Sequence, residues 1–246
     1  MTREKSRSEY QKKYPYPRRQ FIRRIIQGFI SVAAGMLTDY NIEGRENLPK
    51  EGPLLVVGNH FHFLDTIAPI YSTPYPLEFI GDAEMPAAPT IMKIFPRLWS
   101  TLTIIQGTPN LESMRAAEAV LAQGGILAIF PEGHVHKLPL GGPLPGASYL
   151  ALRSGVPIVS IATYSEDDWD LFGTIFHKHR RARICTRIGK LFGPLSDRDQ
   201  NGIPGREDVK AAGLEIMTQI AQLLPVHARG PYLRLKVDPV ETLPLA

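Results

Sequence analysis

The sequence predicts an α/β fold in which a mostly parallel central sheet is flanked by helices. Short apolar runs bounded by Pro, Gly or polar residues alternate with segments whose apolar side chains recur at helical spacing. Strands that alternate with helices favour a parallel sheet, because each helix carries the chain back to the same edge. A length of 246 residues and a hydrophobic content of 43% suit one large domain with a substantial core.

Each element of this fold is expected from a local pattern. Apolar runs predict strands at 53–58, 77–80, 103–105, 126–130, 157–162 and 183–188, and amphipathic patterns predict helices at 111–122, 147–153 and 208–224. The last strand alternates in polarity, which is typical of a half-exposed strand at the edge of a sheet. The polar stretch 41–49 and the Pro- and Gly-rich stretch 138–146 are expected to be loops.

Positive charge is concentrated at the N-terminus. Residues 1–24 contain nine Lys or Arg and two Glu, whereas the rest of the chain contains 19 basic and 22 acidic residues. The apolar stretch 25–37 is too short to span a bilayer as a helix, which takes about 20 residues. We therefore expect a basic arm and an amphipathic helix at 1–40, lying on an anionic membrane surface, and a folded domain at 41–246.

Two other interpretations of the N-terminal segment remain open. It is also compatible with a signal peptide, or with a core helix preceded by a solvated basic tail. The long polar lead and the interrupting Gly28 and Gly35 disfavour a signal peptide. Nucleic acid is not expected as a partner, since no nucleic-acid-binding motif accompanies the arm. Cys185 is the single cysteine, so no intrachain disulfide can form.

A histidine and an aspartate follow the first predicted strand of the domain. Asn59 and His60 come directly after the strand 53–58, and Asp65 lies five positions beyond His60. A carboxylate can accept a hydrogen bond from one ring nitrogen of a histidine, which leaves the other nitrogen free to take a proton from a hydroxyl. This spacing predicts a base and its orienting partner, although it also arises readily by chance.

A rarer motif follows another predicted strand. Phe-Pro-Glu-Gly occupies positions 130–133 at the end of the apolar run 126–130. Pro cannot continue a central strand and Gly permits backbone angles closed to other residues, so Glu132 is expected at a forced bend. Open α/β sheets bind their ligands at this edge, where the strands end.

The two motifs together resemble the glycerolphosphate and 1-acylglycerol-3-phosphate acyltransferases. They lie 72 residues apart from His60 to Glu132, and the strand entered through Pro157 looks like a further block of that family. The resemblance implies an acyl thioester donor, acyl-CoA or acyl carrier protein, and a hydroxyl of a lysophospholipid or related lipid-like acceptor. It identifies 41–246 as an acyltransferase domain that uses no cofactor beyond the donor and no metal. We expect a peripheral or monotopic protein on the cytoplasmic face of the membrane.

The resemblance also assigns roles to individual residues. His60 would be the general base and Asp65 would orient it. Glu132 and Gly133 would position the acceptor. The candidate substrate-binding residues are Asn59, Gly107, Glu132, Gly133 and Lys137.

The chain departs from the family pattern at positions that usually carry cations. Gly107 stands where an Arg is expected, Asp82 where a Lys is common, and the stretch 134–137 replaces a small residue followed by Arg-Ser. A phosphate dianion requires charge-assisted donors, which Lys137 and Arg115 are left to supply. We therefore expect an acceptor that is less anionic than lysophosphatidic acid, or a lysophospholipid that is held differently.

Two rival functions use the same residues. His60, His62, His134 and His136 could bind zinc and form a metal-dependent hydrolase. The missing cations are also compatible with a non-catalytic lipid-binding relative, although the intact His60 and Asp65 argue against it.

Overall fold

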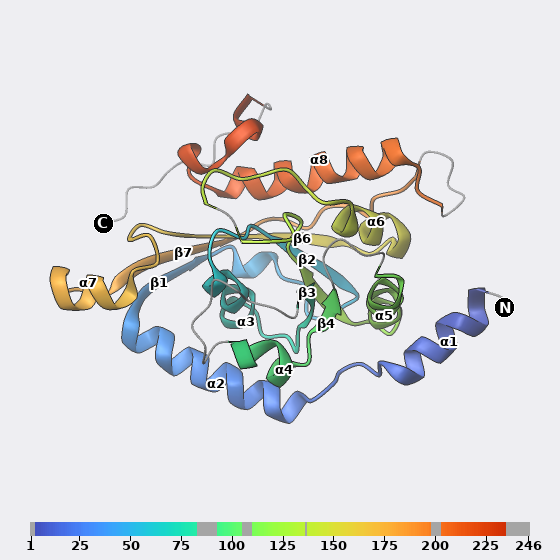
Figure 1. The fold of residues 1–246 in the computed structure, drawn as a ribbon, viewed down its shortest axis with the longest axis horizontal. Coiled ribbons are helices and arrows are strands. Elements are labelled where there is room, and N and C mark those ends of the chain that lie inside the picture. Colours follow the sequence, from blue (N-terminus) through green and yellow to red (C-terminus); the bar gives the residue numbers. More distant parts are fainter. Residues whose placement is uncertain (1–2, 83–92, 105–109, 136, 198–202, 235–246) are drawn as a thin grey trace.

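The computed structural model describes residues 3–82, 93–104, 110–135, 137–197 and 203–234. Within these residues the centre is a seven-stranded sheet with the order β1-β7-β6-β2-β5-β3-β4 (Figure 1). The strands are β1 (Thr38–Glu43), β2 (Leu54–Gly58), β3 (Glu78–Asp82), β4 (Leu102–Ile104), β5 (Ile126–Ile129), β6 (Ile158–Ser165) and β7 (Ala182–Ile188). Neighbouring strands are parallel except for β6 and β7, which confirms the predicted mostly parallel sheet.

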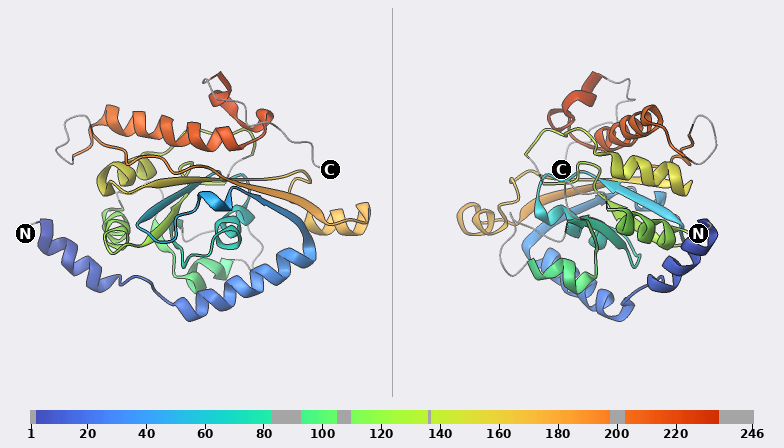
Figure 2. Two further views of the ribbon diagram at one scale, coloured as in Figure 1. Left: turned by 180° about the vertical axis from the view of Figure 1, so that it is seen from behind. Right: turned by 45° about the vertical axis from the view of Figure 1, so that its right-hand side comes forward.

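Helices cover both faces of this sheet (Figures 1 and 2). They are α1 (Arg3–Lys13), α2 (Gln20–Leu37), α3 (Ile67–Ser72), α4 (Phe95–Trp99), α5 (Leu111–Leu121), α6 (Pro145–Ser154), α7 (Leu171–Lys178) and α8 (Arg206–Leu223). The three helices expected from the sequence are present as α5, α6 and α8. No helix in the described part of the chain has the length and apolarity needed to cross a membrane.

The central strands divide the interior into two cores, because successive side chains of a strand point to opposite faces. Leu55 and Val57 of β2 pack with α5, α6 and α8. Leu54 and Val56 pack with α3, α4 and the inner side of α2. Burial on both faces explains why β2 and β5 are uniformly apolar in sequence.

The predicted edge of the sheet was wrong. Strand β7 lies between β6 and β1, and the true edge on that side is β1, which includes part of the predicted loop 41–49. The sequence of β1 is polar and resembles a loop, so this strand was not predicted. An edge strand faces solvent along one side, and here Tyr40 reaches inward, its hydroxyl 2.7 Å from that of Thr186 on β7.

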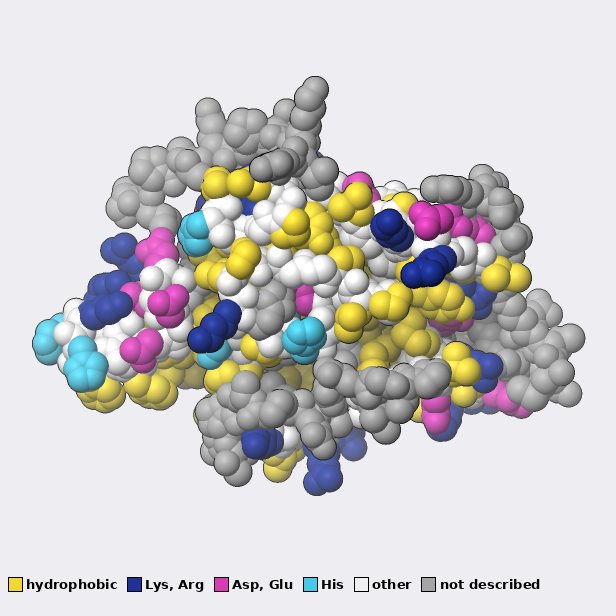
Figure 3. All heavy atoms as spheres, turned by 45° about the horizontal axis from the view of Figure 1, so that its top comes forward, with side chains coloured by type: hydrophobic (Ala, Val, Ile, Leu, Met, Phe, Trp, Pro, Cys, Tyr) yellow, Lys and Arg dark blue, Asp and Glu magenta, His cyan; other side chains and the backbone are white. Residues whose placement is uncertain are grey.

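The two sides of the molecule differ in surface chemistry. Over α6 and α8, acidic, basic and apolar side chains are interspersed (Figure 3). On the opposite side, α2 exposes an apolar stripe that recurs every three or four residues and consists of Phe21, Ile25, Phe29, Val32 and Met36. The amphipathic helix therefore starts within the basic arm, five residues earlier than the apolar stretch indicated.

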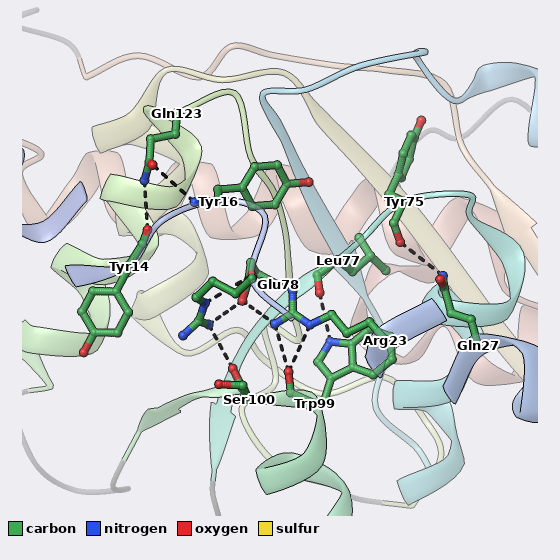
Figure 4. A network of polar contacts seen from close by, with 11 residues as sticks. Tyr14, Tyr16, Arg23, Gln27, Tyr75, Leu77, Glu78, Trp99, Ser100 and Gln123 are labelled. Carbon is green, nitrogen blue, oxygen red and sulfur yellow. Dashed lines mark hydrogen bonds and ion pairs between the residues drawn. The ribbon is translucent and has the colours of Figure 1, made fainter. Parts of the chain in front are cut away.

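Part of the basic arm lies inside the protein (Figure 4). Arg23 is fully buried and forms a paired ion bridge with Glu78, with Nη1 to Oε1 at 2.6 Å and Nη2 to Oε2 at 2.8 Å. Arg18 also binds Glu78, and both guanidinium groups donate to backbone carbonyls near α4. These two arginines of the basic arm therefore fasten α2 to the sheet.

Candidate active site

The histidine and glutamate motifs meet at one edge of the sheet. Strand β2 ends before Asn59, β5 ends before Phe130, and the two strands are parallel neighbours with Val57 opposite Ile129. Parallel neighbours end at the same edge, so the two predicted bends lie side by side. The sheet order therefore brings together residues that are 72 positions apart in sequence.

His60 sits between an aromatic ring and a carboxylate. Its imidazole stacks on Phe130, with ring centroids 4.5 Å apart, and its side chain is 13% exposed. Its Nδ1 lies 3.9 Å from Oδ2 of Asp65, which is an ion-pair distance but too long for a hydrogen bond. Among the described residues, neither Nδ1 of His60 nor Oδ1 of Asp65 has a hydrogen-bond partner. Catalytic hydrogen bonds are often this long before substrate binds.

Asp65 is held by the backbone of its own loop. Its Oδ2 accepts hydrogen bonds from the amides of Phe61 at 2.5 Å and His62 at 2.7 Å, at the start of a 3₁₀ turn over Phe63–Thr66. Burial raises the pKa of the Asp65 carboxyl, and the neighbouring His60 and the two amides oppose that rise. The carboxylate is therefore fixed in position, and Oδ2, which accepts from both amides, is also the oxygen that faces the imidazole.

Glu132 and Gly133 support the bend beneath His60. The Glu132 side chain is buried, and its two oxygens accept hydrogen bonds from the amides of His60 at 2.7 Å and Gly141 at 2.8 Å. Gly133 has a φ of +74°, and a Cβ there would lie 2.3 Å from Leu144. These contacts tie the histidine loop to the predicted loop 138–146. Their proposed contact with the acceptor stays a prediction.

The remaining predicted substrate-binding residues are less concentrated. Both polar groups of the Asn59 amide bond to the backbone of Thr163 on β6, each at 2.8 Å, so Asn59 joins two strands and its substrate contact stays a prediction. Lys137 is exposed on the segment that follows Gly133. Gly107 lies outside the described residues.

Known proteins resemble this chain in sequence and in fold. A family profile described as acyltransferase matches residues 39–164, a segment that contains the histidine loop, the glutamate bend and β6. The chain belongs to the acyltransferase family.

Two individual acyltransferases illustrate the relationship. A 1-acyl-sn-glycerol-3-phosphate acyltransferase of Borreliella burgdorferi is 25% identical over 149 residues, which cover 55% of each chain. This chain thus spans about half the length of that relative. The crystal structure of the 1-acyl-sn-glycerophosphate (LPA) acyltransferase PlsC of Thermotoga maritima matches with a TM-score of 0.53 and 20% identity, over 85% of this chain and 84% of that one. This likeness establishes the shared fold.

The acyltransferase site has an aromatic neighbour that the sequence did not reveal. The Trp169 ring lies parallel to that of His62, with centroids 5.3 Å apart. His62 accepts a hydrogen bond from the amide of Leu64 at Nδ1, and burial, with a smaller effect of His60, lowers its pKa to about 4. A neutral imidazole that accepts at Nδ1 carries its proton on Nε2. No local pattern links Trp169 to His62, which lies 107 positions earlier.

The turn that carries Trp169 is strained and strongly braced. Asp168 and Trp169 have φ values of +50° and +61°, in the left-handed region that side chains disfavour. The hydroxyl of Ser165 accepts from the amide of Trp169 at 3.2 Å. The buried carboxylate of Asp167 binds Arg180 through two bonds of 2.7 and 2.8 Å, and these contacts lower its pKa.

The rival metal site finds no support in the described residues. Within them, no group of three or more His, Cys, Asp or Glu side chains is arranged to hold an ion. His134 is exposed, and His136 lies outside the described residues.

Proposed function

We propose that this protein is an O-acyltransferase that moves a fatty acyl group from an acyl thioester to a hydroxyl of a lysophospholipid or related lipid-like acceptor. The donor is acyl-CoA or acyl carrier protein. The observation that carries this proposal is the meeting of His60, Asp65 and the Glu132 bend at one edge of the sheet. Membership in the acyltransferase family and the names of the two relatives support the reaction class.

His60 acts as the general base in this mechanism. Asp65 accepts from Nδ1, which directs Nε2 toward the acceptor hydroxyl and stabilises the imidazolium that forms. The acceptor oxygen attacks the thioester carbonyl as Nε2 takes its proton. The carbon–sulfur bond then breaks, and the imidazolium returns the proton to the departing thiolate. No acyl-enzyme is required, because the hydroxyl attacks the thioester directly.

The acceptor is proposed to be less anionic than lysophosphatidic acid, or to be held differently from it. This proposal rests on the sequence at Gly107 and Asp82, where cations are missing. Charge-assisted hydrogen bonds are roughly twice as strong as neutral ones, so a phosphate dianion binds more weakly where these cations are absent. Comparison of lysophosphatidic acid with an uncharged monoacylated alcohol tests the point, and a strong preference for lysophosphatidic acid would overturn it.

A membrane surface is the proposed partner of α2. Its exposed stripe is apolar, and Arg19 and Arg24 remain exposed beside it for anionic head groups. A protein bound in this way is peripheral or monotopic, and we assign it to the cytoplasmic face. The acceptor is itself a lipid, so an enzyme docked on the bilayer meets its substrate there.

The decisive experiment replaces the general base. His60→Ala is expected to lower the rate of thiol release from acyl-CoA or acyl carrier protein by a factor of about 10² to 10⁴. Circular dichroism and thermal unfolding should match wild type. His134→Ala is the matched control, because this exposed histidine has no part in the mechanism. Retention of most activity by His60→Ala, or loss of activity with a chelator, would reject the mechanism.

A further inference from the structure

Helix α7 presents two large aromatic side chains to solvent. Phe172 is 61% exposed and Phe176 is 69% exposed. They lie four residues apart on one helix and therefore on one face. Neither belongs to either hydrophobic core, whereas Thr174 between them is fully buried. The helix thus packs with its polar threonine inward and keeps its phenylalanines outward.

The structure holds this exposed helix firmly. Asp170 caps its first turn by accepting from the amide of Gly173 at 2.9 Å. Asp167 binds Lys178 at the other end of the helix at 2.8 Å, in addition to Arg180. The strained backbone at Asp168 and Trp169 leads directly into it. A turn with a strained backbone and several hydrogen bonds leads into a helix that exposes two phenylalanines. This combination indicates a surface that binds a partner.

Helix α7 lies beside the end of α2. Arg181, just after α7, donates through Nη1 to the carbonyl oxygen of Gly35 at 2.8 Å. The apolar stripe of α2 continues to Met36, which is 70% exposed. Figures 1 and 2 show the two helices meeting at one end of the molecule. The exposed phenylalanines therefore extend the apolar surface of α2 around this end.

The helices on this side carry charges of one sign. Helices α2, α4 and α7 contain no acidic residue, and they carry Arg24, Arg97 and Lys178 at exposed positions. Helices α5 and α8, by contrast, carry several acids on their exposed faces, among them Glu112 and Glu215. The turn before α7 adds the exposed acids Glu166, Asp168 and Asp170, so the complementarity to anionic phospholipid comes from the helices themselves, which are apolar and cationic.

We propose that α7 is a second membrane-contact element, with Phe172 and Phe176 entering the interface of an anionic phospholipid bilayer next to α2. The inference deepens the membrane partnership of the proposed function and rests on it. A single helix on a surface leaves rotation about its own axis undefined. A second contact away from that axis fixes the rotation. Because α7 follows the end of β6, on the edge that carries His60, this contact turns the active site toward the lipid.

The test measures binding to vesicles and needs no acyl transfer. The variant Phe172→Ser/Phe176→Ser is expected to bind vesicles of phosphatidylglycerol and phosphatidylcholine on the order of tenfold more weakly than wild type. Leu214→Ser on α8 is the matched control, because Leu214 is 50% exposed on the opposite side. Its binding should equal that of wild type. Unchanged binding of the double variant would overturn the proposal.

Two further measurements distinguish a failure of the α7 proposal from a failure of the proposed acyl transfer or of folding. With a water-soluble short-chain acceptor the double variant should keep wild-type activity, while activity on a vesicle-embedded acceptor falls with binding. If neither wild type nor any variant transfers acyl groups, the proposed function fails. The vesicle-binding result then still decides the role of α7. If the double variant does not fold, a photoactivatable phospholipid in wild-type vesicles should cross-link to residues 171–178, and labelling confined to α2 would reject the proposal.

The alternative occupant is a second copy of the chain. Sedimentation without lipid should give a monomer for wild type. A stable dimer that the double variant dissociates would assign the surface to self-association and overturn the proposal.

Discussion

At the scale of single residues, the site depends on side chains that position the histidine loop. Glu132 lies beneath the loop and accepts from the amides of His60 and Gly141. Glu132 contacts the backbone amide of His60, whereas Asp65 faces the imidazole ring. A carboxylate has two acceptor oxygens and an amide has one, so this arrangement requires an acid at position 132.

Glu132→Gln is expected to leave one of the two buried amides unpaired. The free energy of unfolding should fall by about 1–3 kcal/mol, measured by urea denaturation. The value of kcat should fall more than KM rises, because His60 is displaced while substrate contacts remain. Glu118→Gln serves as control, since the partly exposed Glu118 pairs with Arg153 at the surface and its loss should change stability by less than about 1 kcal/mol. Equal kcat in Glu132→Gln and wild type would contradict this role.

Trp169 is expected to act as a positioning residue. Its ring stacks on His62, whose backbone amide binds Asp65, so loss of the indole loosens the carboxylate that orients the base. Trp169→Ala should lower kcat with little change in KM for a detergent-solubilised acceptor. Trp169→Phe, which retains a stacking ring, should restore most of the rate. If both variants keep wild-type kcat and differ only in melting temperature, Trp169 has a purely structural role.

His62 predicts how stability depends on pH. Its pKa is about 4 in the folded protein, below the ordinary value of 6.5, so the unfolded chain binds the extra proton first as pH falls. Stability from this group is therefore lost as pH drops from 6.5 toward 4. The raised pKa of Asp65 has the opposite sign. His62→Gln should lose less stability than wild type between these pH values in urea titrations. An identical pH dependence would show that His62 is not the titrating group.

At the scale of elements, α2 is joined to the sheet by a buried charge cluster. Figure 4 shows Arg23 between Glu78 and the carbonyl of Trp99. Glu78 is the first residue of β3, which is parallel to β5, so the cluster lies at the end of the strand opposite the active-site edge. A buried ion pair contributes little net stability, but one partner alone is costly. The cluster thus fixes where the proposed membrane helix sits relative to β3.

Glu78→Gln should reveal this coupling. It removes the charge that compensates Arg23, and the free energy of unfolding should fall by about 3–5 kcal/mol. Arg23→Met/Glu78→Leu, which replaces both partners with apolar groups, should recover most of that loss, while Arg18 can turn to solvent. Chemical denaturation of both variants measures the difference. A loss below about 1 kcal/mol for Glu78→Gln would mean that the cluster is dispensable.

At the scale of the whole molecule, the sheet order brings the end of α2 and the start of α7 to the active-site edge. Strand β7 is antiparallel to its neighbour β6, and β1 is parallel to β7. The entry to β1 and the turn before β7 therefore lie at the edge where β2 and β5 end. Helices α2 and α7 reach that edge for the same reason. The proposed lipid-facing side and the proposed catalytic edge are therefore joined by topology.

Local patterns in the sequence predict the central strands, the main helices and the two motifs. Each is a local pattern: a strand buried on both faces is apolar along its length, and the bend after β5 carries Pro131 and Gly133. The family resemblance followed from the same residues. The sheet edge at β1 was missed because an edge strand has no such requirement and its polar side chains look like a loop.

Which residues each motif contacts could be seen from the three-dimensional fold alone. Glu132 binds the amides of His60 and Gly141, Arg23 binds Glu78, and Trp169 covers His62. These partners are brought together by the order of strands and by the paths of connecting turns. A local pattern reports how a residue is buried, but which distant residue lies against it depends on how the whole chain packs.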